Sequence, residues 1–250
     1  MAENFAIRKA AAILEAITNN SGPSNIADLS RQLEMPRQTV HRILTQLSEV
    51  GLVVRDEARQ RFSVGGRLRA LSLATLIQTQ SDTAANLVLR ALVDDLHETC
   101  NVGMLDGDSV VYLCRAECDW PLRAQLGPGS HVPAYCTAIG KLLLAHLPGA
   151  ERENVLGSMQ LRRITPYTLT SPQELEEDLK ETLVRGYSIN NQEDSIGLIA
   201  IAVPVANGSG RVVAGLAVHA PEARLPIVEA VKRVSLLRRT ATKLTSLLFS

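Results

Sequence analysis

Side chains that can hydrogen-bond to DNA recur along residues 37–45 at spacings that place them on one face of a helix. They are Arg37, Gln38, Thr39, His41, Arg42 and Thr45. Arginine can donate two hydrogen bonds to guanine, glutamine can pair with the edge of adenine, and threonine can contact phosphate or a thymine methyl group. Arg42 is placed to meet backbone phosphate at the edge of the groove. The spacing therefore predicts a recognition helix for the DNA major groove.

Two predicted helices would hold these side chains in a helix-turn-helix arrangement. The first covers residues 25–33, with Ser24 as its N-cap, because a serine side chain can accept a hydrogen bond from the first helical turn. The second begins at Pro36, which suits a helix start, and runs to about Val50. Its predicted buried stripe consists of Val40, Ile43, Leu44 and Leu47. With the predicted helix at 5–17, a three-helix packing unit with a polar face is the alternative.

A basic hairpin is predicted after the second helix. Residues 52–55 and 61–64 flank a polar tip, a pattern typical of two paired strands. Arg59 and Arg61 lie at this hairpin, where a wing can enter the adjacent minor groove or contact phosphate. Ser24 completes the predicted DNA contacts. Turn, arginines and hairpin together indicate a winged helix-turn-helix that binds double-stranded DNA.

The formal net charge of zero conceals a partition along the chain. Residues 1–80 hold ten basic and seven acidic side chains, whereas residues 81–250 hold sixteen and nineteen. Eight arginines and no lysine lie between Arg31 and Arg69. Such a local cluster favours phosphate contact, although a solvated surface is the alternative. With 46% hydrophobic residues the chain is not disordered, and 3% aromatic residues disfavour a base-stacking RNA platform.

The second half is predicted to be an α+β domain with an antiparallel sheet. The predicted strands are 101–105, 109–115, 122–126, 187–190, 198–205 and 211–219. The predicted helices are 84–99, 138–147, 171–185 and 225–248, with Ser171 and Glu174 as a capping box. We therefore expect a DNA-binding domain over residues 1–66, a linker helix over 67–82 and a second domain over 83–250.

An ordered set of motifs resembles the isocitrate lyase regulator (IclR) family of bacterial transcription factors. Residues 26–44 resemble the family's helix-turn-helix, 61–65 its wing and 68–77 its linker helix. The second half continues in the same order with residues 105–112, 140–145, 185–187, 201–205 and 210–214. Each motif alone is weakly specific, but together they cover nearly the whole chain.

This resemblance implies a cytoplasmic, two-domain regulator of a catabolic operon. Its winged helix-turn-helix would read a pseudo-palindromic operator, and its GAF-like domain with a curved sheet would bind a small organic acid. The family forms homodimers or homotetramers and contains both repressors and activators. No cofactor or metal is expected for this chain.

The resemblance also implies which residues contact the effector. Matching motif by motif gives Leu122, Ala138, Ile139, Gly140, Asn190, Leu198, Ala200, Ala217 and His219. The first helical turn at Ala138 offers backbone N–H groups that suit a carboxylate. Ala217 and His219 are two residues apart on one strand and therefore share a face.

Four of these positions depart from relatives that bind small oxoacids, which often carry Asp, Cys and two Ser where this chain has Asn190, Ala200, Ala217 and His219. We expect the two alanines to enlarge the pocket and Asn190 to remove a negative charge. His219 would donate to a carboxylate or phenol near neutral pH, with a strand histidine that binds no ligand as the alternative. Residues 133–137 resemble regulators of aromatic-acid catabolism, so we expect an aromatic or otherwise bulky carboxylate.

The sequence gives weaker support for other kinds of site. Cys114 and Cys118, with Cys100 and Cys136, could form a zinc or redox site, but buried free cysteines are commoner. No nucleophile elbow or phosphate-binding loop is present, so an enzyme is not expected. A small-molecule, metal or redox sensor whose N-terminal unit only dimerises remains the alternative function. The N-terminus does not resemble a secretory signal, and residues 198–206 are too short to span a membrane.

Overall fold

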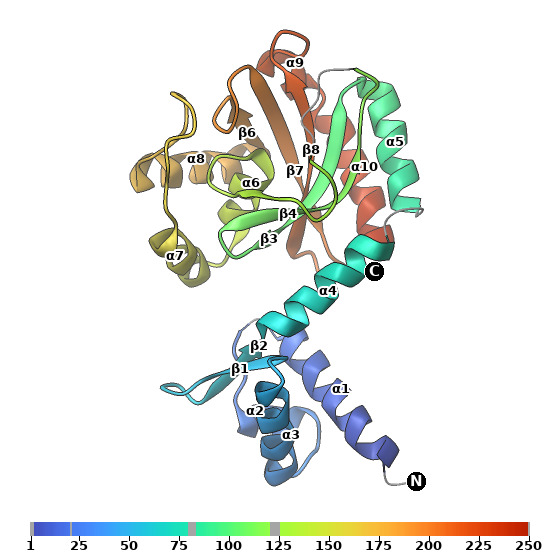
Figure 1. Ribbon diagram of the computed structural model, residues 1–250, viewed down its shortest axis with the longest axis vertical. Helices are drawn as coiled ribbons and strands as arrows, with labels where there is room; N and C mark the ends of the chain where they lie inside the picture. The colour runs from blue at the N-terminus through green and yellow to red at the C-terminus, as the bar shows by residue number, and fades with distance from the viewer. Residues whose placement is uncertain (1–2, 21, 80–83, 121–125, 250) are drawn as a thin grey trace. The chain divides into compact units, whose positions relative to one another are not determined.

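A computed structural model describes residues 3–20, 22–79, 84–120 and 126–249 of the chain (Figure 1). By its internal contacts the chain divides into two compact units, Met1–Leu76 and Ile77–Ser250. The division falls inside the helix α4, Gly66–Thr79, where the sequence predicted a linker helix. Each unit is described by itself.

In the part of the N-terminal unit that the structure describes, three helices and a two-stranded hairpin precede α4. Its elements are α1 (Glu3–Asn19), α2 (Ile26–Gln32), α3 (Arg37–Glu49), β1 (Val53–Asp56) and β2 (Arg61–Val64). The predicted stripe of α3 is buried and packs against Ile13, Leu29 and Phe62 in one apolar cluster. The strands pair antiparallel, with Val53 opposite Val64 and Asp56 opposite Arg61. The predicted winged helix-turn-helix is therefore confirmed.

The N-cap of α2 was predicted one residue too early. Asn25, not Ser24, caps this helix, and the Asn25 side chain accepts a hydrogen bond from the backbone N–H of Asp28. Ser24 instead forms a β-bridge with Phe62. The backbone of Ser24 is thus committed to the hairpin, which leaves the next residue to satisfy the first turn of the helix.

The C-terminal unit is built on one antiparallel sheet in the order β5-β4-β3-β8-β7-β6 (Figure 1). Its strands are β3 (Thr99–Asp106), β4 (Ser109–Ala116), β5 (His131–Pro133), β6 (Ser188–Asn191), β7 (Leu198–Ala206) and β8 (Val212–Pro221). Its helices are α5 (Ala84–Leu96), α6 (Ala138–His146), α7 (Gly149–Ser158), α8 (Pro172–Arg185), α9 (Ile227–Lys232) and α10 (Val234–Leu248). The predicted α+β class and curved antiparallel sheet are confirmed.

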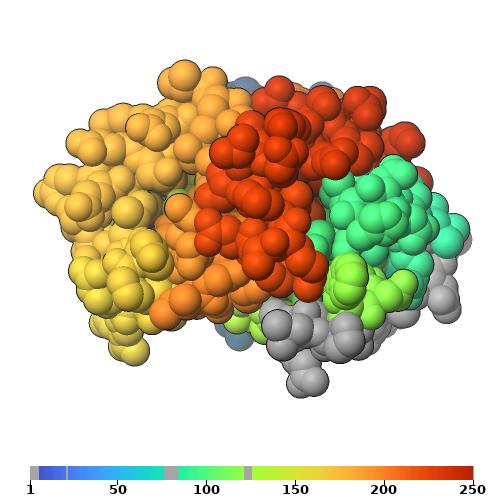
Figure 2. All heavy atoms as spheres, turned by 90° about the horizontal axis from the view of Figure 1, so that it is seen from above, coloured from blue at the N-terminus to red at the C-terminus, as the bar shows by residue number. Residues whose placement is uncertain are grey.

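The strand register assigns the two faces of this sheet to different helices. Ala200 lies opposite His219, and Ala202 lies opposite Ala217, so these four residues share one face. This face packs on α6, whereas α5 and α10 cover the other face. In Figure 2 the residues of α7 and α8 (yellow to light orange) and those of α5 (green) lie on opposite sides of the unit. The core therefore has a sheet between two helical layers.

Several predicted elements differ from the structure. The helix expected at 225–248 is two helices divided at Arg233, and the helix expected to reach Thr99 ends at Leu96. The short strand β5 and the helix α7 were not predicted, because neither has a distinct apolar period. The strand expected at 122–126 falls almost wholly outside the described residues. The capping box is half confirmed, since Ser171 accepts from the Glu174 backbone N–H.

Among the helices of the described residues, none combines the length and the apolar character that crossing a membrane requires.

Candidate functional site

The exposed face of α3 carries the side chains predicted to read DNA. Arg37, Gln38, His41, Arg42 and Thr45 are exposed, whereas Thr39 is half-buried. At 100° per residue the five exposed side chains fit within an arc of about 140°, and the buried stripe occupies the opposite side. This face is therefore both polar and separate from the core, as a recognition helix requires.

The turn between α2 and α3 fixes the direction in which α3 leaves its scaffold. The Ser30 hydroxyl donates to the Met35 carbonyl at 2.6 Å, and the Met35 N–H donates to the Ser30 carbonyl at 3.0 Å. Glu34 takes a positive φ of 51°, which lets the chain reverse within three residues. Pro36 then stands as the N-cap of α3. The local sequence thus presents the first turn of α3, with Arg37 and Gln38, to the outside.

The remaining predicted DNA contacts lie at the hairpin and at Ser24. Arg59 and Arg61 are exposed, and the Asp56 carboxylate accepts from the Arg59 backbone N–H at 3.1 Å to close the turn. Ser24 is 5% exposed, and its hydroxyl accepts from the Asn20 amide at 2.8 Å. Sequence reasoning missed Arg55, which is also exposed on this hairpin and lies over the Phe62 ring. The hairpin therefore presents three arginines.

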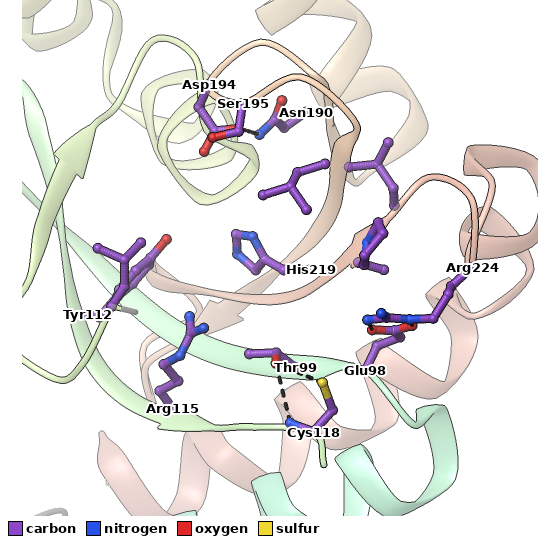
Figure 3. A pocket seen from close by; sticks show the side chains of 15 residues that line it. Glu98, Thr99, Tyr112, Arg115, Cys118, Asn190, Asp194, Ser195, His219 and Arg224 are labelled. Carbon is purple, nitrogen blue, oxygen red and sulfur yellow. Dashed lines mark hydrogen bonds and ion pairs between the residues drawn. The ribbon is translucent and has the colours of Figure 1, made fainter. Parts of the chain in front are cut away.

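A small cavity of about 90 Å³ lies in the C-terminal unit at one end of the sheet, lined by residues of β3, β4, β6, β7 and β8 and of the segments that adjoin them (Figure 3). Its polar lining residues are Glu98, Thr99, Tyr112, Arg115, Asn190, Asp194, Ser195, His219 and Arg224. The register explains this gathering, because Thr99 lies opposite His219 and Asn190 lies opposite Ala200, which in turn lies opposite His219. Segments far apart in the sequence thus bring their side chains to one face.

Three of the nine predicted effector contacts line this cavity, namely Asn190, Leu198 and His219. Ala138, Ile139, Gly140, Ala200 and Ala217 are instead buried in the core. Ala200 and Ala217 pack in the same cluster as α6, so they do not enlarge the cavity as expected. A Cβ atom at Gly140 would come within 2.1 Å of the Ala134 carbonyl oxygen, which shows how tightly this helix start is packed. Leu122 lies outside the described residues.

His219 occupies the middle of the cavity wall. Burial, together with the positive charge of Arg115, lowers the pKa of His219 to about 4, so the imidazole is neutral at pH 7. Its Nε2 atom is shielded from solvent and makes no hydrogen bond to a described residue. The Tyr112 ring meets it edge-on, with the ring centroids 6.4 Å apart. The sequence led us to expect that His219 donates to a ligand near neutral pH. Because desolvation disfavours the imidazolium, the neutral ring has a single N–H with which to donate.

The Asp194 side chain lines the cavity and supplies the carboxyl group that Asn190 lacks. The Asn190 amide donates to the Asp194 carboxylate at 2.5 Å and accepts from the Glu193 N–H at 2.9 Å. Burial raises the pKa of Asp194. Asn190 therefore serves to orient a carboxylate four residues away. Sequence reasoning missed Asp194 because the β6–β7 connection has no regular apolar period.

Two further charged pairs border the cavity. Arg224 donates to both carboxylate oxygens of Glu98, at 2.6 Å and 2.7 Å, in a bidentate pair. The Arg115 side chain is 4% exposed, and its Nε lies 3.3 Å from a carboxylate oxygen of Glu117. The cavity thus has charged walls around a neutral histidine, which suits a small polar ligand.

The four cysteines are all buried, and none of them forms a disulfide bond. Burial raises the pKa of Cys114 and that of Cys136, each to about 12, so neither thiol is ionised near neutral pH. Within the described ranges no group of three or more His, Cys, Asp or Glu side chains could hold a metal ion.

A winged helix-turn-helix and a separate unit with a polar cavity define a class of protein, the DNA-binding transcriptional regulator with an effector-binding domain. Comparison with known families supports this class. Residues 6–57 match the IclR helix-turn-helix domain, and residues 74–246 match the bacterial transcriptional regulator IclR C-terminal family. The chain belongs to the IclR family of bacterial transcriptional regulators.

Individual relatives match most of the chain. The transcriptional regulator SauR of Cupriavidus necator is 42% identical over 241 residues, which are 96% of each chain. The crystal structure of the Thermotoga maritima IclR covers 98% of both chains with a TM-score of 0.63 at 24% identity, which shows the shared fold. The inducer-binding domain of PobR from Acinetobacter, solved with 3-hydroxybenzoic acid, covers 64% of this chain and 95% of its own, with a TM-score of 0.58 and 30% identity.

Proposed function

We propose that this regulator reads a pseudo-palindromic operator through the exposed face of α3 and the arginines of the hairpin. The observation that carries the proposal is the separation on α3 of an exposed polar face from a fully apolar buried stripe. Arg37 and Gln38 would contact base edges, while Arg42, Arg59 and Arg61 would contact phosphates. His41 and Thr45 lie within the same face, and Thr39 lies at its border. Ser24, which is bridged to Phe62 of the hairpin, is a further proposed contact.

A gel-shift experiment tests this reading. The full chain is mixed at moderate salt with DNA from upstream of the neighbouring operon and with shuffled DNA of equal length. We expect a retarded band with the operon DNA at concentrations at least tenfold below those needed for shuffled DNA. Equal retardation of both would contradict recognition of a specific operator, and retardation of neither would contradict DNA binding.

We further propose that the effector is a small organic acid bound in the cavity beside His219. PobR was solved with an aromatic acid, and the sequence favoured one here. However, a cavity of about 150 Å³ is known to admit benzene, and the cavity of this chain holds about 90 Å³. The lining therefore supports an acid smaller than an aromatic one, bound among polar side chains.

The proposed mechanism is thermodynamic linkage in a cytoplasmic homodimer or homotetramer. An acid that binds one arrangement of the subunits more tightly shifts the population toward it, and the change in DNA affinity cannot exceed that difference. A thermal-shift screen of aliphatic and aromatic acids tests the effector class, because a bound ligand raises the melting temperature by mass action. Stabilisation by benzoates alone would overturn the size argument.

A further inference from the structure

The cavity of the C-terminal unit contains a carboxyl group that no described residue pairs with a cation. Among the described residues that line the cavity, the charged side chains are Glu98, Arg115, Asp194 and Arg224. Arg224 donates to both carboxylate oxygens of Glu98, and Arg115 forms an ion pair with Glu117 at 3.3 Å. Asp194 has the Asn190 amide as its side-chain partner, and in Figure 3 it lies on the opposite side of the His219 ring from Arg115. Asp194 is therefore the negative end of the cavity.

The titratable groups around Asp194 are neutral near pH 7. Burial, and after it the charge of Asp194, raises the pKa of Tyr112 on β4 and that of Cys136 ahead of α6, each to about 12. His219 on β8 lines the same cavity, and its pKa is lowered to about 4. Burial also raises the pKa of Asp194 itself, because its charged form is poorly solvated. The surroundings of Asp194 thus disfavour any further negative charge.

The charged groups on the adjoining helices are paired with each other. Lys141 on α6 has its Nζ atom 2.6 Å from Glu193 and 3.0 Å from Asp178, and Arg185 lies 3.2 Å from Asp178. None of these four residues lines the cavity. Each described cation at or beside the cavity therefore already has a carboxylate partner, whereas Asp194 has a neutral amide.

A small acid in this cavity places a second carboxylate close to Asp194. In a compact space of about 90 Å³ the two groups are about 6 Å apart at most, and two negative charges at that distance in a protein weaken binding by about 100-fold. Two carboxyl groups in one site avoid this repulsion when they hold a single proton between them. A charge-assisted O–H···O⁻ hydrogen bond then replaces the repulsion.

We infer that the effector acid binds together with one proton, which its carboxylate shares with the carboxyl group of Asp194. This inference rests on the proposed effector role of the cavity. The proton comes from solvent and forms one O–H bond, no other bond is made or broken, and the complex has one negative charge over two carboxyl groups. Asp194 thereby favours a small monocarboxylic acid, because a dicarboxylate brings a further charge that the shared proton does not neutralise.

Titration calorimetry of the full chain with acetate and with glycolate, between pH 6 and pH 9, tests the inference. Both probes are ionised throughout this range, and Tyr112, Cys136 and His219 titrate outside it. The affinity for each acid should fall at least tenfold in total from pH 6 to pH 9, because a proton enters with the acid. Where the affinity falls, titrations in two buffers of different ionisation enthalpy should show uptake of up to one proton for each acid bound.

Two variants of Asp194 separate the shared proton from a structural role. Asp194→Asn supplies an amide N–H without needing a proton, so its affinity for both acids should be independent of pH and, at pH 9, at least tenfold above that of the unaltered chain. Asp194→Ala has no donor and should bind both acids at least tenfold more weakly at pH 6. Glu193, whose pKa burial also raises, is present in all these chains and cannot cause a difference between them.

Asp95→Asn, at an exposed position on α5, is the matched control and should keep the pH dependence of the unaltered chain. An affinity that is constant from pH 6 to pH 9, or one that depends equally on pH in Asp194→Asn, would overturn the inference but leave an acid-binding regulator. If Asp194→Asn does not fold, the pH profile and proton uptake of the unaltered chain still decide. Absence of acid binding at every pH would instead contradict the proposed effector role, and the gel shift tests operator binding separately.

Discussion

At the residue scale, Arg37 has the most direct expected effect on DNA recognition. Because a bidentate arginine–guanine contact is worth about 1–3 kcal/mol, Arg37→Ala should weaken operator binding by roughly five- to 150-fold. It should also relax base preference at one position in each half-site. Fluorescence anisotropy on single-base operator variants measures both effects. Arg239→Ala removes the same charge from an exposed position on α10 and should bind like the unaltered protein.

His219 predicts a pH dependence of stability. Its pKa is lowered from the ordinary 6.5 to about 4 in the folded chain, so between these values the unfolded chain binds more protons. Stability should therefore fall as pH decreases from about 6.5 to about 4, by at most about 3 kcal/mol. His219→Gln should remove this component, which urea unfolding at pH 7 and pH 5 would show.

The comparison must be made between variants, because other groups act in the opposite direction. Burial raises the pKa of Glu193 and of Asp194, so the folded chain is relatively favoured when those carboxylates are protonated. The control is His41→Gln at an exposed position on α3, which should keep the pH dependence of the unaltered chain. If His219→Gln keeps it too, the lowered pKa is refuted.

At the element scale, a buried ion cluster joins α6, α8 and the β6–β7 connection. Lys141 on α6 is 2% exposed, and its Nζ lies 2.6 Å from Glu193 and 3.0 Å from Asp178. Asp178 in turn pairs with Arg185 at 3.2 Å. Because Glu193 precedes Asp194, this cluster fixes the base of the connection that carries the negative end of the cavity.

Removal of the lysine should therefore affect both stability and effector binding. Lys141→Met leaves Glu193 without its cation and Asp178 with Arg185 alone, and should cost about 3–5 kcal/mol of unfolding free energy. Chemical denaturation measures the loss, and the affinity for the acid should fall because Asp194 is displaced. Lys180→Met, at an exposed position on α8, should change neither quantity by more than about 0.5 kcal/mol. Equal effects of the two substitutions would show that the cluster does not hold the connection.

Regular elements could be predicted from the sequence, whereas most of the cavity could not. The stripe from Val40 to Leu47 and the exposed Arg37 follow from one helical period, and both were predicted. The cavity instead depends on strand register, which brings Thr99 opposite His219 across 120 residues of chain. Asp194 and Arg224 lie in irregular connections, where side-chain direction is set by hydrogen bonds rather than by a repeat. Of the effector contacts that the resemblance predicted, Asn190 and His219 line the cavity, whereas Ala200 and Ala217 pack in the core.

At the scale of the whole molecule, the net charge of zero does not prevent strong dependence of DNA binding on salt. Eight arginines lie within residues 31–69, so we expect counterion release at the operator to depend on that segment and not on the total charge. The logarithm of the affinity should fall linearly with the logarithm of salt concentration. Arg42→Ala should reduce the slope by about one for each subunit bound. An unchanged slope would remove Arg42 from the phosphate contacts.

The central claim is that a small acid in the C-terminal cavity changes how the N-terminal unit binds DNA. The most direct measurement is operator affinity by anisotropy with and without saturating acetate or glycolate, in the unaltered chain and in Asp194→Ala. The account predicts a change of at least fivefold in the unaltered chain, in either direction, and none in the variant. An operator affinity that no small acid alters, or one that changes equally in both proteins, would contradict it.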